Sequence, residues 1–294
     1  VTSGYQQRDF SLIERLMTQV RVLWQYLAWL GLPDISSMGF HHDDIAVARH
    51  FFPPSGTFYG TVAWLVTVVA ALLLRDRYPL LLFALLFFLV GHMLESSVLA
   101  LELVYEHRNY LPSIGVCLLL SYILTSEKLL FSKVSPILPL GGVLCILASL
   151  LFLRVDSWSD EHLLARSNVI NHPSSTRANY WYGQVLLEKA NAVRSRDNRE
   201  GEIEALVVAA RGYFKRAHHL SPNNLPAIVS LYIMDEQYFP VLSTRENWFS
   251  ILANASTNRV MQASDYAALS ILVAKLRSDE GGIKKHRLER LIDN

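Results

Sequence analysis

One stretch of the sequence, from Gly91 to Ser113, concentrates acidic, basic and amide side chains between two long apolar runs. The side chains in it that could transfer a proton or bind an anion are His92, Glu95, Glu102, Glu106, His107, Arg108 and Asn109. Ionisable groups at the edge of a bilayer are costly unless they are paired or face water, so they indicate a functional site. The alternative is a hydrated turn between two membrane helices. Because these groups are denser than a turn requires, we expect a functional cluster.

Arg108 has the chemistry to bind the phosphate of a lipid at a membrane surface, because a guanidinium can hold two phosphate oxygens at once. A neighbouring glutamate could orient this arginine or accept a proton from an acceptor. The alternative is an ion pair between Arg108 and Glu106 or Glu102 that only fixes the turn. The predicted substrate-binding residues are Glu95, Glu102, Glu106, His107, Arg108, Asn109 and Tyr110.

A second candidate site lies in a loop predicted over residues 33–60, which contains His41, His42, Asp43 and Asp44. Adjacent His and Asp side chains can bind a divalent metal, but sequence neighbours rarely converge on one ion, and neither HxxxH nor HExxH spacing is present. We therefore expect a solvated or substrate-facing loop and assign no metal ligand. A divalent metal at these four residues is the alternative.

Composition divides the chain into two parts. It has 294 residues, of which 51% are hydrophobic, and it is mostly apolar up to about Arg154. Polar and charged residues are frequent beyond that point, which predicts a membrane part followed by a soluble part. The net charge is +1 and no basic patch is interleaved with aromatic residues, so we expect no nucleic-acid partner. Cys117 and Cys145 lie in apolar runs and indicate neither a disulfide framework nor a metal site.

Apolar periodicity predicts the helices. Residues 10–32 have helical spacing, with Ser11 as the N-cap and Glu14 at the capping-box position. Polar interruptions and tryptophans favour a helix that lies in the membrane interface. The four apolar runs that follow are Thr61–Leu74, Leu80–Leu94, Leu111–Leu124 and Ile137–Leu153. We therefore expect an interfacial helix and external loop over 1–60, four transmembrane helices over 61–154, and a soluble domain over 155–294.

Basic residues in the short loops predict the orientation. Arg75 and Arg77 lie between the first two runs, and Lys128 and Lys133 lie between the last two. The positive-inside rule puts both loops in the cytoplasm. The 33–60 loop, the charged cluster and everything after Arg154 then face the other side. We expect an integral protein of a bacterial inner membrane whose C-terminal domain is periplasmic.

The region after Arg154 has the pattern of tetratricopeptide repeats. The residues at the fixed positions of one repeat are Ala178, Tyr182 and Gly183 in its first helix and Ala210, Phe214, Ala217 and Pro222 in its second. Residues from about Asn191 to Glu204 exceed the repeat length and predict a loop insertion. Such repeats stack into a superhelix with a concave face for a protein partner. The predicted fold is thus all-α, with polytopic transmembrane helices followed by a soluble α-solenoid of tetratricopeptide-like repeats.

These residues together resemble a known family. Glu95-Ser-Ser, then Tyr105-Glu-His-Arg-Asn-Tyr-Leu-Pro-Ser113, two further spans and the repeats look like bacterial multi-span membrane proteins with C-terminal tetratricopeptide repeats. Those proteins are distantly similar to the eukaryotic transmembrane and tetratricopeptide repeat containing (TMTC) O-mannosyltransferases. The segment Arg15–Leu27 is similar to the one that precedes the family's last spans. The chain begins with Val and no signal peptide opens it, so we expect the C-terminal part of a longer protein.

The resemblance implies a GT-C-type glycosyltransferase, which transfers a sugar from a polyprenyl-phosphate donor to an acceptor at the non-cytoplasmic face of the membrane. The family's acidic catalytic residue lies in a first external loop, and no stretch of this sequence matches that loop. We therefore assign no catalytic residue and no cofactor. Two alternatives stay open. One is an O-antigen polymerase or ligase, which depends on external Arg and His residues. The other is a membrane-anchored scaffold whose repeats recruit a partner.

Overall fold

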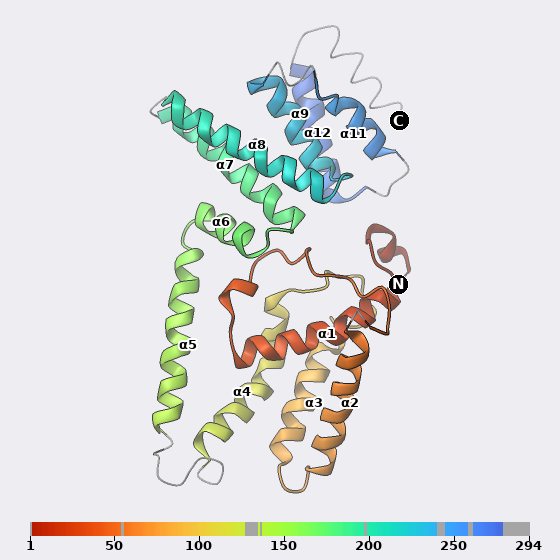
Figure 1. Cartoon of the computed structure of the whole chain (residues 1–294), viewed down its shortest axis with the longest axis vertical. Coiled ribbons are helices and arrows are strands. Elements are labelled where there is room, and N and C mark those ends of the chain that lie inside the picture. Colours follow the sequence, from red (N-terminus) through yellow and green to blue (C-terminus); the bar gives the residue numbers. More distant parts are fainter. Residues whose placement is uncertain are drawn as a thin grey trace. The chain divides into compact units, whose positions relative to one another are not determined.

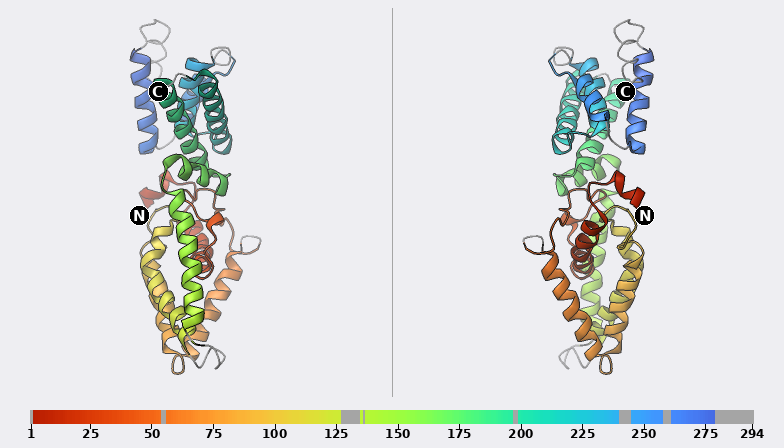
Figure 2. Two further views of the ribbon diagram at one scale, coloured as in Figure 1. Left: turned by 90° about the vertical axis from the view of Figure 1, so that its left-hand side faces the viewer. Right: turned by 90° about the vertical axis from the view of Figure 1, so that its right-hand side faces the viewer.

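The chain folds into helices and connecting turns in the computed structural model, which describes residues 2–53, 56–126, 135, 137–196, 199–239, 245–257 and 261–278. No strand occurs among these residues, so the predicted all-α class is confirmed. The chain divides into two compact units, Val1–Asp160 and Glu161–Asn294. Figures 1 and 2 show the helices of the two units.

The first unit contains five α-helices and three short 3-10 helices among its described residues. In chain order these are η1 (Thr2–Gln7), α1 (Leu12–Gly31), η2 (Ile35–Ser37), α2 (Thr57–Leu73), α3 (Pro79–Met93), η3 (Glu106–Asn109), α4 (Tyr110–Thr125) and α5 (Ile137–Ser157). Helix α1 runs across the ends of α2, α3 and α4 from which the polar loops leave (Figure 1).

Helix α1 begins where the sequence predicts, because Ser11 and Glu14 form a capping box. The Ser11 hydroxyl accepts from the Glu14 N–H, and the Glu14 carboxylate accepts from the Ser11 N–H. Two tryptophans tie α1 to α2. Trp24 Nε1 donates to the Gly60 carbonyl and Trp64 Nε1 donates to the Val20 carbonyl, each at 3.1 Å. The buried face of α1 carries Arg15, Thr18, Gln19, Val22, Tyr26 and Trp29, so it is partly polar.

Helices α3 and α4 approach each other closely at Gly115. A Cβ added there would lie 3.0 Å from Phe87 Cβ and 3.1 Å from the Ala84 carbonyl oxygen. Glycine therefore sets the distance between the two helices, because any side chain would push them apart.

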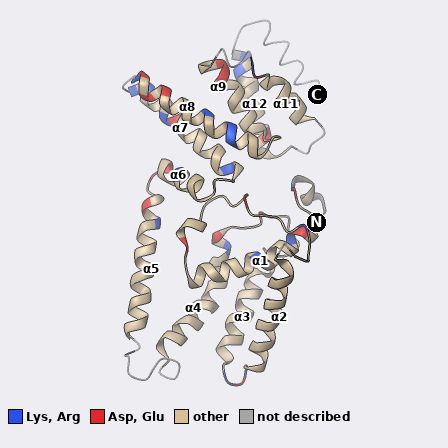
Figure 3. Ribbon diagram, viewed as in Figure 1, with Lys and Arg blue, Asp and Glu red and all other residues tan. Residues whose placement is uncertain are grey.

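Lys, Arg, Asp and Glu are absent from α2, α3 and α4 and occur in α5 only in its last turns (Figure 3). Of the described helices, α5 is long and apolar enough to cross a membrane, while α2 and α3 are apolar but shorter. The apolar run Leu80–Leu94 becomes the 15-residue helix α3. At about 1.5 Å per residue, α3 falls short of a hydrocarbon core of about 30 Å. Four spans therefore stay a prediction. Lys128 and Lys133, which support the orientation, lie outside the described residues.

The second unit contains six helices among its described residues. These are α6 (Glu161–Asn171), α7 (Thr176–Arg196), α8 (Glu200–Leu220), α9 (Leu225–Tyr238), α11 (Trp248–Ser256) and α12 (Ala263–Ser278). Helices α7 and α8 lie side by side along their length (Figure 1). They meet where Gly183 faces Phe214, since a Cβ on Gly183 would lie 2.8 Å from the Phe214 ring. Ala210 and Ala217 are fully buried on α8.

The loop insertion predicted from about Asn191 to Glu204 is wrong for the described residues. Helix α7 continues to Arg196 and α8 already begins at Glu200, so most of the extra residues lengthen these two helices. The reason is that apolar residues continue at helical spacing into this segment. Ile203 is buried there, and Val193 packs against the same core.

A buried carboxylate joins three helices of the second unit. Asp235 on α9 is fully buried and accepts from Arg211 Nε at 2.6 Å and Arg211 Nη2 at 2.7 Å. Trp248 Nε1 also donates to Asp235 Oδ2 at 2.8 Å. This pairing raises the pKa of Arg211. A buried carboxylate is tolerated only with such partners, and the arrangement fixes α8, α9 and α11 together.

Candidate functional site

The loop that follows α3 is held by an arginine of α1. The Arg15 side chain is fully buried, and its guanidinium donates to main-chain oxygens of Glu95 (2.6 Å), Ser97 (3.1 Å), Glu102 (3.4 Å) and Leu101. Among the described residues, all of its hydrogen-bond acceptors are carbonyl oxygens. Burial lowers the pKa of Arg15. Arg15 therefore determines the path of the loop, because a guanidinium carries five donors in one plane.

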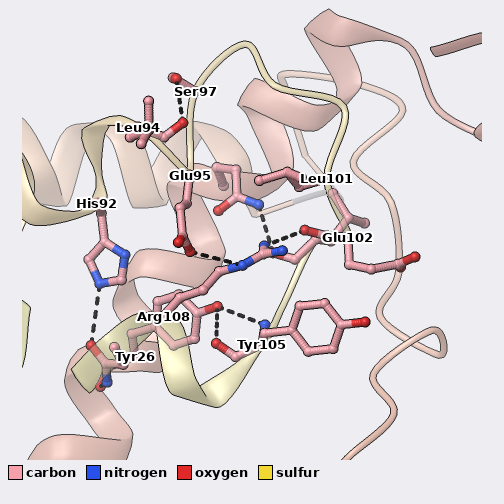
Figure 4. Close-up of polar contacts among 12 residues, drawn as sticks. Tyr26, His92, Leu94, Glu95, Ser97, Leu101, Glu102, Tyr105 and Arg108 are labelled. Carbon is pink, nitrogen blue, oxygen red and sulfur yellow. Dashed lines mark hydrogen bonds and ion pairs between the residues drawn. The ribbon is translucent and has the colours of Figure 1, made fainter. Parts of the chain in front are cut away.

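Two further side chains of α1 continue this pattern. Gln19 Nε2 donates to the Leu103 carbonyl at 2.7 Å. The Tyr26 hydroxyl donates to the Tyr105 carbonyl and accepts from the Tyr105 N–H, both at 3.0 Å (Figure 4). One face of α1 thus binds the loop backbone at successive turns from residue 95 to residue 105. The sequence contained a signal for this face, since polar residues 15 and 19 share it with Val22.

Arg108 is enclosed within the charged cluster. Its side chain is 6% exposed, and its Nε lies 3.0 Å from Glu95 Oε2. Its Nη1 donates to the Glu102 carbonyl at 2.5 Å, and its guanidinium lies 4.8 Å from the centre of the Tyr105 ring (Figure 4). The ion pair with Glu106 or Glu102, which was the alternative to a phosphate role, is not formed, and Glu95 is the glutamate that orients Arg108. The pairing favours a structural role for Arg108, and a phosphate role stays a prediction.

Glu102 has its own partner from the start of the chain. Arg8 Nη1 lies 2.5 Å from Glu102 Oε1, and Arg8 Nε donates to the Ala100 carbonyl at 3.2 Å. Arg8 could not be predicted as a site residue, because Arg8 and Glu102 are distant in sequence and no local pattern connects them.

Glu106 connects three segments of the first unit. Its Oε1 accepts from the Gly39 N–H at 2.6 Å and lies 3.5 Å from His42 Nε2, while its Oε2 pairs with Arg154 Nη2. His42 is buried against Trp29, with ring centroids 5.6 Å apart. Glu106 therefore holds the 33–60 loop and the end of α5 next to η3.

The structure does not gather the second candidate site around a metal. His42 is buried and Asp43 is exposed, while His41 and Asp44 are intermediate. Within the described residues, no three His, Cys, Asp or Glu side chains are placed to share an ion. His42 is thus brought to the charged cluster through Glu106, and the metal alternative gains no support from the geometry.

His92 and Asn109 form a buried polar pair at the junction of α3 and α4. His92 Nε2 lies 3.3 Å from Asn109 Oδ1, and Asn109 Nδ2 donates to the Tyr26 carbonyl at 3.1 Å. The His92 ring stacks on Tyr26 with centroids 5.0 Å apart. This pair anchors η3 and the first turn of α4 to α1.

A cavity of about 820 Å³, named here the α1–α5 cavity, adjoins the charged cluster. Four of the predicted site residues line it, namely Glu106, His107, Asn109 and Tyr110. The predicted residues outside its lining are Glu95, Glu102, Arg108, His41, His42, Asp43 and Asp44. No local sequence pattern predicts the lining that comes from Arg154 in the last turn of α5 and from Trp158, which directly follows the helix.

The lining of the α1–α5 cavity is largely apolar and includes a few polar and charged groups. Its apolar and aromatic lining includes Trp29, Leu30, Phe40, Leu147, Leu150 and Leu151. Its polar lining includes Glu106, His107, Ser113 and Arg154. A cavity with this combination of lining residues can hold an amphiphilic molecule, because apolar walls bind the tail while a few polar groups orient the head.

No protein family, no curated protein and no solved structure matches this chain.

Proposed function

We propose that this chain is the C-terminal part of a membrane glycosyltransferase that uses a sugar donor linked to polyprenyl phosphate. The proposed arrangement is polytopic in a bacterial inner membrane, with the charged cluster and the C-terminal domain on the periplasmic side. The observation that carries the proposal is the α1–α5 cavity, which combines a largely apolar lining with the polar and charged groups Glu106, His107 and Arg154. A donor of this class is itself an isoprenoid chain that ends in a charged sugar phosphate.

The charged cluster supports the proposal by keeping the cavity wall rigid. The loop from residue 95 to residue 105 is bound by α1, and the same loop leads into η3, which carries Glu106 and His107. Side chains on such a supported segment are held in position before a substrate binds, which lowers the cost of binding. Glu95 and Arg108 then act as positioning residues, while Glu106 and His107 face the cavity.

The second unit supports a role in binding an acceptor or partner protein. Ala210 and Ala217 are buried, and Gly183 packs on Phe214, at the positions where a tetratricopeptide-like repeat needs small residues at helix contacts. Repeats of this kind bind extended segments of other proteins on a concave face. We therefore assign the second unit to acceptor or partner binding and assign no catalytic residue to it.

The test is sugar transfer by the full-length protein in a reconstituted bilayer. Polyprenyl phosphate carrying a radiolabelled sugar is supplied, and label in protein, in longer glycan chains and in free sugar is measured separately. Label in protein that depends on the added enzyme is the expected result. Label only in lengthened glycan chains would favour a polymerase. A folded protein that transfers no label to any acceptor, yet captures a partner through its second unit, would favour the scaffold.

A further inference from the structure

The walls of the α1–α5 cavity change from apolar to charged along α5. Leu147, Leu150 and Leu151 line one part of the cavity, and Arg154 lines it further along the same helix. At about 1.5 Å per residue, the seven residues from Leu147 to Arg154 cover about 10 Å of helix. The hydrocarbon tail and the polar head of one amphiphilic molecule can lie about this distance apart.

The apolar part of the cavity extends toward the membrane-spanning portion of α5. A second hollow of about 320 Å³ shares Pro33, Leu147 and Leu150 with the cavity and adds Val143 and Ile146. No residue of α5 is buried, and α5 is the described helix that is long and apolar enough to cross a membrane. A hydrocarbon chain from the bilayer therefore has a continuous apolar surface along this helix.

Arg154, which lines the cavity, has N–H groups that can still donate hydrogen bonds to an anion. Within the described residues, Arg154 uses Nη2 for Glu106, and no other partner is recorded for its remaining N–H groups. His107 is exposed and also lines the cavity. The guanidinium of Arg108, by contrast, is occupied by Glu95 and by the Glu102 carbonyl. An arginine with one edge on a carboxylate can still hold an oxyanion with its other donors.

We propose that the α1–α5 cavity binds one lipid molecule with a single phosphate head. The phosphate lies at Arg154 and His107, and the hydrocarbon chain lies along Leu147, Leu150 and Leu30. Trp29 and Trp158 line the same cavity, and tryptophan is favoured at the boundary between lipid and water. This lipid site adds a ligand class to the proposed function. It rests on that function in one respect, namely that the chain is embedded in a membrane. Phosphate binding, which the sequence had assigned to Arg108, is thereby assigned to Arg154.

The test uses the full-length protein in phosphatidylcholine nanodiscs with an alkyl phosphate that carries a diazirine in its chain. After illumination, labelled peptides are mapped by mass spectrometry. Labelling is expected at residues 147–151 and at residues 29–33. Leu150→Trp fills the cavity and should reduce this labelling about tenfold, as loss of most of the apolar contact implies. The matched control is Leu153→Trp on the same helix, because Leu153 is 61% exposed and does not line the cavity.

The head group is tested by competition. Dodecyl phosphate should displace the label, whereas dodecanol should not. In the Arg154→Gln variant, about tenfold more dodecyl phosphate should be needed, because a charge-assisted hydrogen bond is lost. Arg154→Lys keeps the charge and should be affected less. Thermal unfolding of each variant shows whether the fold is intact.

Three results would overturn the lipid site. They are equal labelling of the Leu150→Trp and Leu153→Trp proteins, equal competition by dodecyl phosphate and dodecanol, and absence of label at α5 because another protein segment fills the cavity. A protein that is labelled as expected but transfers no sugar would support the lipid site and contradict the proposed glycosyltransferase function. The two proposals therefore fail separately.

Discussion

Arg15→Met should be the most damaging single substitution in the first unit. The methionine fills a similar volume but removes every donor that now reaches the carbonyl oxygens of Glu95, Ser97, Leu101 and Glu102. Hydrogen bonds to a charged group contribute about 1.5–3 kcal/mol each, and the cost of burying the guanidinium offsets part of their sum. Because the carbonyls lose their partner inside the protein, we expect a net loss of about 3–5 kcal/mol.

The assay combines thermal unfolding with hydrogen exchange in a mild detergent. A loss of this size corresponds to a fall in Tm of roughly 10 °C for a unit of this length. Amides from residue 96 to residue 104 should also exchange faster, since Arg15 fixes this loop. The matched control is Arg21→Met on the same helix, where one guanidinium N–H reaches the Ala46 carbonyl at 3.5 Å. We expect a change within about 0.5 kcal/mol for this control. Equal effects of the two substitutions, or unchanged exchange in the loop, would refute the role of Arg15.

Three further predictions concern the rest of the chain. The hydrogen bond from Arg49 lowers the pKa of Glu14 from 4.5 to about 2, so its contribution to stability is present above about pH 4.5 and lost as the pH falls toward 2. Glu14→Gln should therefore flatten the fall in Tm over this range. Asp235→Asn should lower the unfolding free energy of the second unit by about 3–5 kcal/mol, because the ion pair between Arg211 and the buried Asp235 carboxylate is broken. Gly183→Ala should cost about 1–3 kcal/mol by overpacking against Phe214.

Each of these predictions has a matched control substitution. Asp9→Asn tests whether any nearby acid gives the same pH dependence as Glu14. If Tm of the Glu14→Gln protein fell with decreasing pH as it does in the unaltered protein, the assigned pKa would be contradicted. Glu236 lies next to Asp235 on α9, so Glu236→Gln is its control. An equal loss of unfolding free energy in the two variants would show that burial of the Asp235 carboxylate is unimportant. Gly212→Ala on α8 has no neighbour within 4 Å of the new Cβ and should be neutral or stabilising. A neutral Gly183→Ala would contradict the close approach of α7 and α8.

Local sequence patterns predicted the elements well. The run Leu111–Leu124 corresponds to α4 at Tyr110–Thr125, and the run Ile137–Leu153 corresponds to the larger part of α5 at Ile137–Ser157. The capping box at Ser11 and Glu14 is also confirmed. These features depend on periodicity and on contacts within four residues, which a sequence displays directly.

The hydrogen-bond and ion-pair partners within the site could not be predicted from local sequence patterns. Arg108 pairs with Glu95 rather than with the nearer Glu102 or Glu106, because the loop folds back on the start of η3. The two residues that hold this arrangement from outside, Arg15 and Arg154, come from helices far away in the chain. Long-range pairs depend on how helices pack, and no local spacing encodes them. The cavity could not be predicted for the same reason, since its lining comes from α1, the 33–60 loop, residues 105–113 and α5.

The most direct test of the central claim is the rate of sugar transfer from a polyprenyl-phosphate donor by the full-length protein in a bilayer. We expect transfer by the unaltered protein, about tenfold slower transfer by Leu150→Trp, and unchanged transfer by Leu153→Trp, because only the first substitution fills the cavity. A folded, reconstituted protein that transfers no sugar, or equal rates for the two variants, would contradict the claim that the α1–α5 cavity holds the donor of a membrane glycosyltransferase.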